Sequence, residues 1–347
     1  MRNVKETLMY ILKRVLLMIA TFLVIFVICF FLIRLLPLDQ STGPGKDPET
    51  FNMMQQALGR MYKDENGVWH KTPIVEQLFT FIKNLIVPAK YEANGEWHTA
   101  SRWGYSWNIS WLATPDSLLA KGLPPTMLIN IYSIFVSVPL GLGLGIYMAL
   151  KKNKWQDHVL SIMVMLLISV PSFVDAFLLQ HLFAYKWNLL PPVRADFDGS
   201  WFTPEMFKSM ILPVISMSFG SIAGYARYTR AELTEVLTSD FMLLARTKGL
   251  SRAQATVRHA FRNSLVPIFP MILGEVLSIL SGSIIIENIF SVNGVGGLFL
   301  QSIQMKDYDV FQFVAMFYIL IGLVGSLAVD ISYGLVDPRI RMGGGKQ

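Results

Sequence analysis

The sequence has 347 residues, of which 53% are hydrophobic and only 16% are charged. A soluble domain usually carries about a quarter charged residues, so this composition excludes an ordinary soluble protein and favours one that spans a membrane. The formal net charge of +6 would suit a nucleic-acid-binding protein. The basic residues cluster beside apolar segments, however, as inner-surface anchors do, so we expect membrane lipid as a partner and no nucleic acid. The single cysteine, Cys29, rules out an intrachain disulfide and a cysteine-based metal site.

The first long apolar run extends from Val15 to Ile33 and follows a basic start. A cleaved signal peptide also has a basic start, but its apolar core is shorter and a small-residue cleavage site follows it. Here the run ends at Arg34, with Pro37 close behind. We therefore predict that residues 1–37 form a cytoplasmic N-terminal segment and an uncleaved first transmembrane helix.

Residues 38–125 have a different composition, because they are polar, mixed in charge and rich in aromatic residues such as Trp103, Tyr105 and Trp107. We predict a small extracytoplasmic insertion of moderate order. Its aromatic side chains are expected to pack a small core or to lie at the level of the lipid headgroups.

Apolar stretches long enough to cross a bilayer recur along the rest of the chain. Five further spans are predicted at about residues 126–150, 159–185, 209–228, 264–286 and 311–335. The segments expected inside are rich in lysine and arginine, whereas the outer loop 287–310 carries one basic residue, Lys306. This bias predicts an all-α membrane protein with six transmembrane helices and both termini in the cytoplasm. Residues 126–341 then form the main membrane domain, and residues 342–347 form a C-terminal tail.

The cytoplasmic segment 230–263 is predicted to form two helices that join at Gly249. Thr238 or Ser239 can cap the first helix, and Asp240 in its first turn complements the helix dipole. Gly249 can take the left-handed backbone conformation that ends a helix.

The second of these helices is predicted to begin at Ser251, because Ser251 and Gln254 have the spacing of a capping box. On the first helix, Phe241, Leu244 and Ala245 share an apolar face. Such a face can lie on the inner membrane surface, pack against the chain's own helices, or dock into a partner protein.

The cytoplasmic segment and three others resemble known motifs. The stretch from Asp240 to Arg252, followed by Arg258 to Pro267, resembles the cytoplasmic loop of binding-protein-dependent ABC importer permeases. The further matches are Glu287 to Phe290 with Gly294 to Gly297, then Asp307 with Tyr308, and Asp330 to Arg339. The resemblance covers residues 126–341 and the N-terminal helix. These motifs are most similar to those of the B-type permeases of dipeptide and oligopeptide transporters. That branch of the family also contains nickel and glutathione importers.

The resemblance implies the fold of a type I importer permease in the bacterial inner membrane. Its expected partners are a homologous permease, two cytoplasmic ABC ATPases and an extracytoplasmic peptide-binding protein. The ATPases would bind ATP and Mg, so this chain needs no cofactor of its own. In that family the cytoplasmic loop forms a coupling helix that inserts into a cleft of the ATPase. The residues expected to make this contact are Asp240, Phe241, Leu244, Ala245 and Gly249.

The sequence has no phosphate-binding Gly-x-x-x-x-Gly-Lys-Ser/Thr loop, and its histidines lack the spacing of a membrane metalloprotease. We therefore expect a subunit without catalytic or metal-binding residues. Two acids, Asp175 and Glu275, lie within predicted spans, where an ionisable group is costly. They are expected either to make hydrogen bonds inside the helix bundle or to line a path for the ammonium group of a peptide.

Two rival functions are weaker. An ion-driven secondary transporter predicts inverted repeats, and the sequence shows none. A membrane enzyme or sensor would need a catalytic constellation or an output domain, and neither is visible. The sequence departs from the commonest permease pattern in the long insertion 38–125, and in the Gly-Val-Gly that follows Asn293 where Pro-Gly is frequent.

Overall fold

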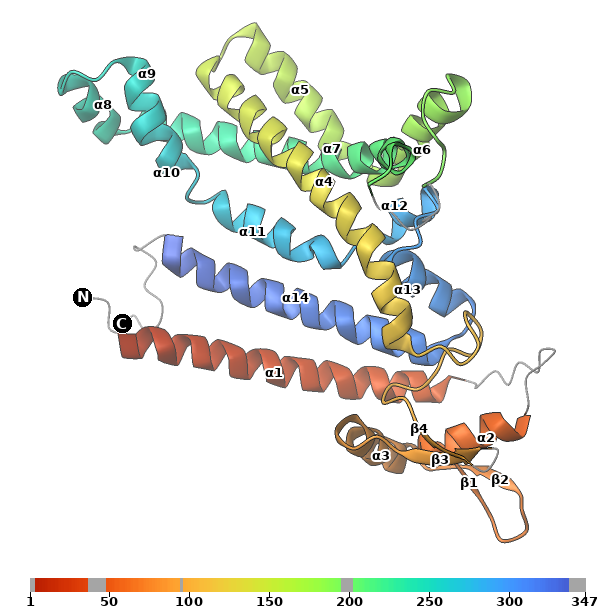
Figure 1. Cartoon of the computed structure of the whole chain (residues 1–347). Helices are drawn as coiled ribbons and strands as arrows, with labels where there is room; N and C mark the ends of the chain where they lie inside the picture. The colour runs from red at the N-terminus through yellow and green to blue at the C-terminus, as the bar shows by residue number, and fades with distance from the viewer. Residues whose placement is uncertain (1–3, 37–47, 94–95, 195–201, 337–347) are drawn as a thin grey trace. The chain divides into compact units, whose positions relative to one another are not determined.

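A computed structural model of the chain describes residues 4–36, 48–93, 96–194 and 202–336 and is mostly helical (Figure 1). The chain divides into two compact units. The first unit comprises residues 1–18, 123–297 and 321–347, and the second comprises residues 19–122 and 298–320. The start of the predicted insertion, the tail 342–347 and the end of the C-terminal motif at Arg339 lie outside the described residues.

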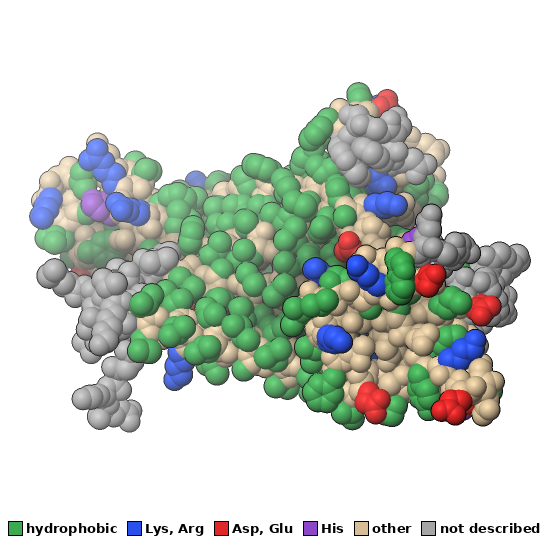
Figure 2. All heavy atoms as spheres, turned by 60° about the horizontal axis from the view of Figure 1, so that its bottom comes forward, with side chains coloured by type: hydrophobic (Ala, Val, Ile, Leu, Met, Phe, Trp, Pro, Cys, Tyr) green, Lys and Arg blue, Asp and Glu red, His purple; other side chains and the backbone are tan. Residues whose placement is uncertain are grey.

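Among the described residues, four unbroken helices are long and apolar enough to cross a membrane. They are α1 (Val4–Leu35), α4 (Pro115–Leu150), α7 (Pro204–Leu237) and α14 (Tyr308–Val336). Figure 2 shows many hydrophobic side chains on the surface of the helices in its view. The chain is therefore a multi-pass membrane protein.

Two further candidate spans are bent. The first joins α5 (Trp155–Ser169) to α6 (Ser172–Leu179) and the π-helix η1 (Gln180–Lys186) with a bend of 99°. The second runs through α9 (Arg252–Ala255), η2 (Thr256–Phe261) and α10 (Arg262–Ser264), then bends by 52° into α11 (Phe269–Leu277) and η3 (Ser278–Leu280). The described residues therefore give four spans, or six if each bent pair counts as one.

Prolines explain both bends. Pro171 follows Val170, whose φ of −82° and ψ of 125° are extended, because a proline disfavours the helical conformation of the residue before it. Pro267 lies between α10 and α11, and Pro270 occupies the first turn of α11, where its missing N–H costs nothing.

Helix α4 begins earlier than the predicted start at Thr126. It begins at Pro115, because proline suits the first helical position and Asp116 complements the dipole of the first turn. Pro124 and Pro125 lie inside the helix without ending it. The pair looks like a boundary in the sequence, but it falls within one continuous helix.

The core of the first unit forms where α4, α6, α7 and α12 (Ile284–Ile289) meet. Helices α4 and α7 approach closely at Gly145, where a Cβ atom would lie 2.7 Å from the carbonyl oxygen of Ala226. A small residue at such a crossing lets two backbones pack tightly, as is common between membrane helices.

The second unit contains α2 (Pro48–Ala57), α3 (Ile74–Ile86), α13 (Val295–Gln304) from Leu298 onward, and two antiparallel hairpins. The hairpins pair β1 (Met61–Lys63) with β2 (Trp69–Lys71), and β3 (Lys90–Ala93) with β4 (Glu96–Thr99). The all-α prediction was wrong here. The strands are too short to show periodicity, although Asn66-Gly67 is a turn signal and Gly67 has a φ of +83°.

Aromatic residues of the insertion pack a small core, as predicted. Met54, Leu58, Tyr105 and Trp107 are buried together, and the rings of Phe51 and Trp107 lie 4.6 Å apart in an edge-to-face contact. Part of residues 38–125 is therefore a folded structure with its own interior.

Candidate functional site

The predicted coupling helix is α8 (Asp240–Thr247), which follows α7 after a sharp turn. Its capping differs from the prediction. The hydroxyl of Ser239 donates to the carbonyl oxygen of Val236 at 2.6 Å, and that of Thr238 donates to Glu235 at 2.9 Å. Both side chains thus satisfy the last carbonyls of α7, and Ser239 gives α8 no side-chain cap.

The C-terminal end of α8 forms as predicted. Gly249 has a φ of +90°, which ends the helix in the left-handed conformation. The capping box is also confirmed, because the Ser251 N–H donates to Gln254 Oε1 at 3.0 Å and the Gln254 N–H donates to Ser251 Oγ at 3.2 Å. Helices α8 and α9 are therefore joined by a defined turn.

The apolar residues of α8 divide between two environments. Met242 and Ala245 are 4% and 7% exposed and pack against buried residues of the same unit. Those residues are Ala149, Leu233, Ala255 and Ala260. Phe241, Leu243 and Leu244 are 40%, 63% and 55% exposed. Ala245 therefore anchors α8 within the chain, and the other three residues form what we call the α8 outer face.

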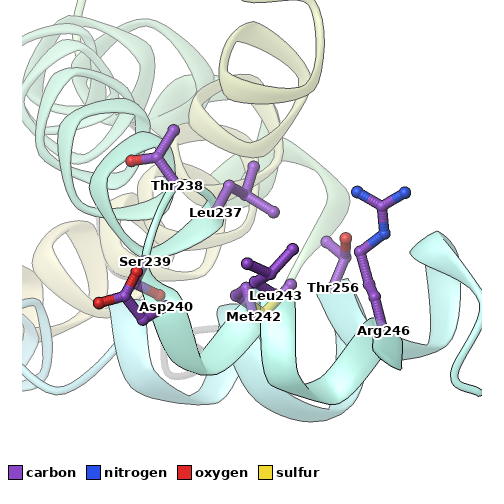
Figure 3. Close-up of a pocket in the computed structure, with 8 residues that line it drawn as sticks. All are labelled: Leu237, Thr238, Ser239, Asp240, Met242, Leu243, Arg246 and Thr256. Atoms are coloured by element: carbon purple, nitrogen blue, oxygen red, sulfur yellow. The ribbon is translucent and has the colours of Figure 1, made fainter. Parts of the chain in front are cut away.

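A hollow of about 400 Å³ lies beside the start of α8. It is lined by Leu237, Thr238, Ser239, Asp240, Met242, Leu243, Arg246 and Thr256 (Figure 3). Figure 3 shows Asp240 and Arg246 at opposite ends of this lining. The edge of the α8 outer face thus borders a recess with an acidic and a basic end.

An ion pair between a buried carboxylate and a partly exposed arginine holds the C-terminal part of α7 near this region. Asp157 on α5 is fully buried and accepts two hydrogen bonds from the Arg230 guanidinium, at 2.6 and 2.8 Å. The Asn153 N–H donates to the same carboxylate at 3.0 Å. A bidentate arginine–carboxylate pair is strong and directional. The pair links α5 to α7 shortly before α8 begins. The basic residues of segment 230–263 did not by themselves predict that Arg230 pairs with Asp157.

The two membrane acids have different surroundings. The Glu275 carboxylate on α11 accepts hydrogen bonds from the Tyr225 hydroxyl on α7 and from Ser137 Oγ on α4, the latter at 3.4 Å. Among the described residues, the half-buried Asp175 side chain on α6 has no recorded hydrogen bond or ion pair. Glu275 therefore joins three helices, and the two acids do not form one cluster.

Sequence reasoning did not assign a role to Glu287, whose carboxyl group is 2% exposed. It accepts hydrogen bonds from Thr126 Oγ1 at 2.8 Å and from the Gly297 N–H at 3.0 Å. Thr126 Oγ1 also accepts from the Val295 N–H at 2.9 Å. Burial raises the pKa of Glu287, and these hydrogen bonds oppose that rise.

Glycines make room for this carboxylate. A Cβ atom at Gly294 would overlap the Glu287 and Thr126 side chains, and one at Gly296 would lie 2.8 Å from the backbone nitrogen of Ile284. The Gly-Val-Gly sequence after Asn293 therefore lets the backbone close around Glu287.

A separate polar cluster holds the insertion together in the second unit. Asp309 accepts hydrogen bonds from both terminal nitrogens of Arg60, at 2.8 and 2.7 Å, and from the Tyr105 N–H at 3.2 Å. Asp307 accepts from Ser106 Oγ at 2.6 Å. It also accepts from the backbone N–H groups of Trp107, Asn108 and Ile109, each at 3.1 Å. Two buried acids thus bind a loop about two hundred residues earlier in the sequence.

Known proteins are similar to this chain over most of its length. A family model described as "Binding-protein-dependent transport system inner membrane component" matches residues 141–342. The dipeptide transport system permease protein DppB of Bacillus subtilis (strain 168) is 32% identical over 96% of this chain and 98% of its own length. The glutathione transport system permease protein GsiC of Salmonella choleraesuis (strain SC-B67) is 29% identical over 96% of this chain and 98% of its own length.

One solved structure shows the fold alone. The MetNI methionine ABC transporter, in its inward-facing conformations, aligns with a TM-score of 0.50 at 14% identity. The alignment covers 64% of this chain and 97% of the chain compared.

Proposed function

Because the chain belongs to the family of binding-protein-dependent transport system inner membrane components, it is a membrane permease subunit of an ABC importer, and we propose that its cargo is a short peptide. The similarity to a dipeptide permease over nearly the full length supports this cargo. Glutathione is the alternative, since a permease for glutathione is similar over the same length. Nickel, which the sequence resemblance also allowed, is a further alternative.

One observation supports a coupling role for α8, namely the exposed apolar side chains of the α8 outer face. Phe241, Leu243 and Leu244 are exposed together, while Met242 and Ala245 hold the opposite side of the same helix in the unit's interior. Large apolar side chains on a rigid helix are typical anchors for a partner's groove. We propose that this face enters a cleft of a cytoplasmic ATPase subunit.

The fixed joints around α8 explain how such a contact transmits movement. The Gly249 turn and the capping box join α8 to α9, and the Asp157–Arg230 pair ties α7 to α5. When the ATPase subunit displaces α8, the ends of several membrane helices therefore move with it, and the movement is not lost by bending of a loop.

The complete transporter pairs this chain with a homologous permease and with two ATPases that bind ATP and Mg. An extracytoplasmic binding protein delivers the peptide. In this proposal each bent helix pair is one span, which gives six spans, cytoplasmic termini and an outer insertion at residues 38–125. The distribution of lysine and arginine supports this orientation.

Glu275 is the better of the two proposed path-lining acids. Its carboxylate lies where α4, α7 and α11 meet, and among the described residues its hydrogen-bond partners are hydroxyl groups, not basic groups. A carboxylate without a basic partner is able to attract the ammonium group of a peptide.

Uptake by the reconstituted transporter tests the cargo. Proteoliposomes that contain the binding protein, both permeases and the ATPases should accumulate labelled dipeptide when ATP is present. Excess unlabelled glutathione should compete weakly. Uptake of glutathione without uptake of dipeptide would overturn the peptide assignment while leaving the role of α8 intact.

A further inference from the structure

Helix α3 in the insertion buries polar side chains and exposes apolar ones. Gln77 and Asn84 are 1% and 6% exposed. The Gln77 amide donates to the Thr72 carbonyl oxygen at 2.7 Å, and the Asn84 amide donates to that of Ala57 at 3.3 Å. These bonds fix the polar side of α3 toward the rest of the second unit.

The opposite side of α3 carries an apolar stripe. Val75, Phe79, Ile82 and Ile86 are 56%, 68%, 42% and 75% exposed. They are spaced four, three and four residues apart, which places them on one face of the helix. A contiguous exposed apolar face of this kind marks a contact with lipid or with another protein.

Aromatic stacking places α3 beside the part of α1 within the second unit (Figure 1). The Phe81 ring lies 5.8 Å from that of Phe26 and 5.5 Å from that of Phe30. These two residues precede the end of α1 at Leu35 by about 14 and about 8 Å, at 1.5 Å per residue. Phe81 therefore packs on a helix that is itself a candidate span from Leu8 to Leu35.

The length of α1 gives a depth for this contact. Its 28-residue span is about 42 Å long, whereas the hydrocarbon core is about 30 Å thick. A centred helix then extends about 6 Å beyond the core at each end. In such a centred helix Phe26 would lie inside the hydrocarbon and Phe30 near its edge, which would put the contact with Phe81 at the boundary between acyl chains and headgroups.

The part of α1 in the same unit also exposes large apolar side chains. Leu23, Ile28 and Leu32 are 54%, 52% and 59% exposed on a membrane-spanning helix, and such side chains normally face lipid. We propose that α3 is an interfacial membrane helix whose Val75–Ile86 stripe inserts among the acyl chains of the leaflet on the insertion's side. Helices with one apolar and one polar side commonly lie in this position.

Spin-label accessibility in the complete transporter tests this placement. A nitroxide is attached to single cysteines introduced as Phe79→Cys and Ile86→Cys in a Cys29→Ala background, within phosphatidylethanolamine–phosphatidylglycerol vesicles. Matched labels at Glu76→Cys on the charged side of α3 and Glu65→Cys in the exposed hairpin serve as controls. For each label we compare the ratio of its collision rate with oxygen to its collision rate with a water-soluble nickel chelate. This ratio should be several-fold higher at positions 79 and 86 than at the control positions.

Two results would overturn the placement. Equal nickel accessibility at all four positions would put the stripe in water, and protection from both reagents at positions 79 and 86 would mean that a protein covers it. Only the identity of the leaflet that α3 enters rests on the proposed function. If the insertion were cytoplasmic, the oxygen result would persist, whereas labelling by a membrane-impermeant thiol reagent at position 65 would come from the other side.

Discussion

Helices α8 and α3 are both short, and both expose large apolar side chains, but different kinds of contact hold them in place. Helix α8 is defined by neighbours in sequence, namely the Gly249 turn and the Ser251–Gln254 capping box. Helix α3 belongs to a unit fixed by contacts that are far apart in sequence, such as the pair between Arg60 and Asp309. Local signals thus define the turn that follows the helix proposed to move with a partner, whereas long-range ion pairs hold together the unit that contains the helix proposed to lie at the membrane surface.

The largest effect should come from Arg60→Ala, because this change leaves the buried Asp309 carboxylate without its bidentate partner. Breaking a buried ion pair typically costs about 3–5 kcal/mol. We expect the thermal unfolding midpoint of the purified subunit to fall strongly. Tryptophan fluorescence, recorded during heating, measures this midpoint. The control Asp64→Asn removes an exposed pair with His70 and should change the midpoint little. A wild-type midpoint for Arg60→Ala would show that the insertion does not depend on long-range pairing.

The Thr126→Val change should have the next largest effect on stability. It removes a hydroxyl that donates to Glu287 and accepts from Val295, and unsatisfied buried groups cost about 1–3 kcal/mol each. Loss of this donor raises the pKa of Glu287 further above its ordinary value. The loss of the Val295 contact is the same at every pH, so the deficit should be smallest at low pH, where Glu287 is protonated, and should grow as pH rises through that pKa. Denaturant unfolding across pH is the measurement, with exposed Thr238→Val as control. A deficit that does not change with pH would contradict the account.

The Gly249→Val change should lower the free energy of unfolding less than the two changes above. It should nevertheless cause a clear loss of transport. A side chain in the left-handed conformation costs about 1–2 kcal/mol, and no described atom lies within 4 Å of the added Cβ. The effect would thus come from the backbone alone. ATP-driven uptake should be lost with Gly249→Val and largely retained with Gly249→Asn, because asparagine tolerates this conformation. Equal loss in both variants would exclude backbone strain as the cause.

The comparison also shows what the sequence could predict. Glycine and capping signals identified the turn after α8, and hydropathy located each long span, although α4 begins well before its predicted start at Thr126. The division of α8 into buried Ala245 and exposed Phe241 depends on packing against residues outside this helix, such as Ala149 and Leu233, so the periodicity of α8 alone could not reveal it. The contacts of Asp307 and Asp309 cross about two hundred residues, and nothing local to either acid predicts them.

The smallest effect should come from Asp240→Ala. The Asp240 carboxylate lies in the first turn of α8, where favourable interaction with the helix dipole is worth about 0.3–1 kcal/mol. Uptake should fall modestly, and Asp240→Glu should restore it, because the charge is retained. Complete loss of uptake with a normally folded subunit would mean that Asp240 itself contacts the partner, and the hollow that it shares with Arg246 would then be part of the interface.

The most direct test compares one substitution in the two helices, Phe241→Ala in α8 and Phe79→Ala in α3. Both phenylalanines are exposed, so neither change should leave a buried cavity. In reconstituted transporters, ATPase retention, ATP hydrolysis and peptide uptake are measured together. We predict that Phe241→Ala loses uptake, with ATPase subunits weakly retained or hydrolysing ATP without transport, and that Phe79→Ala transports like the wild type. Wild-type uptake by Phe241→Ala would contradict the assignment of α8 as the coupling helix.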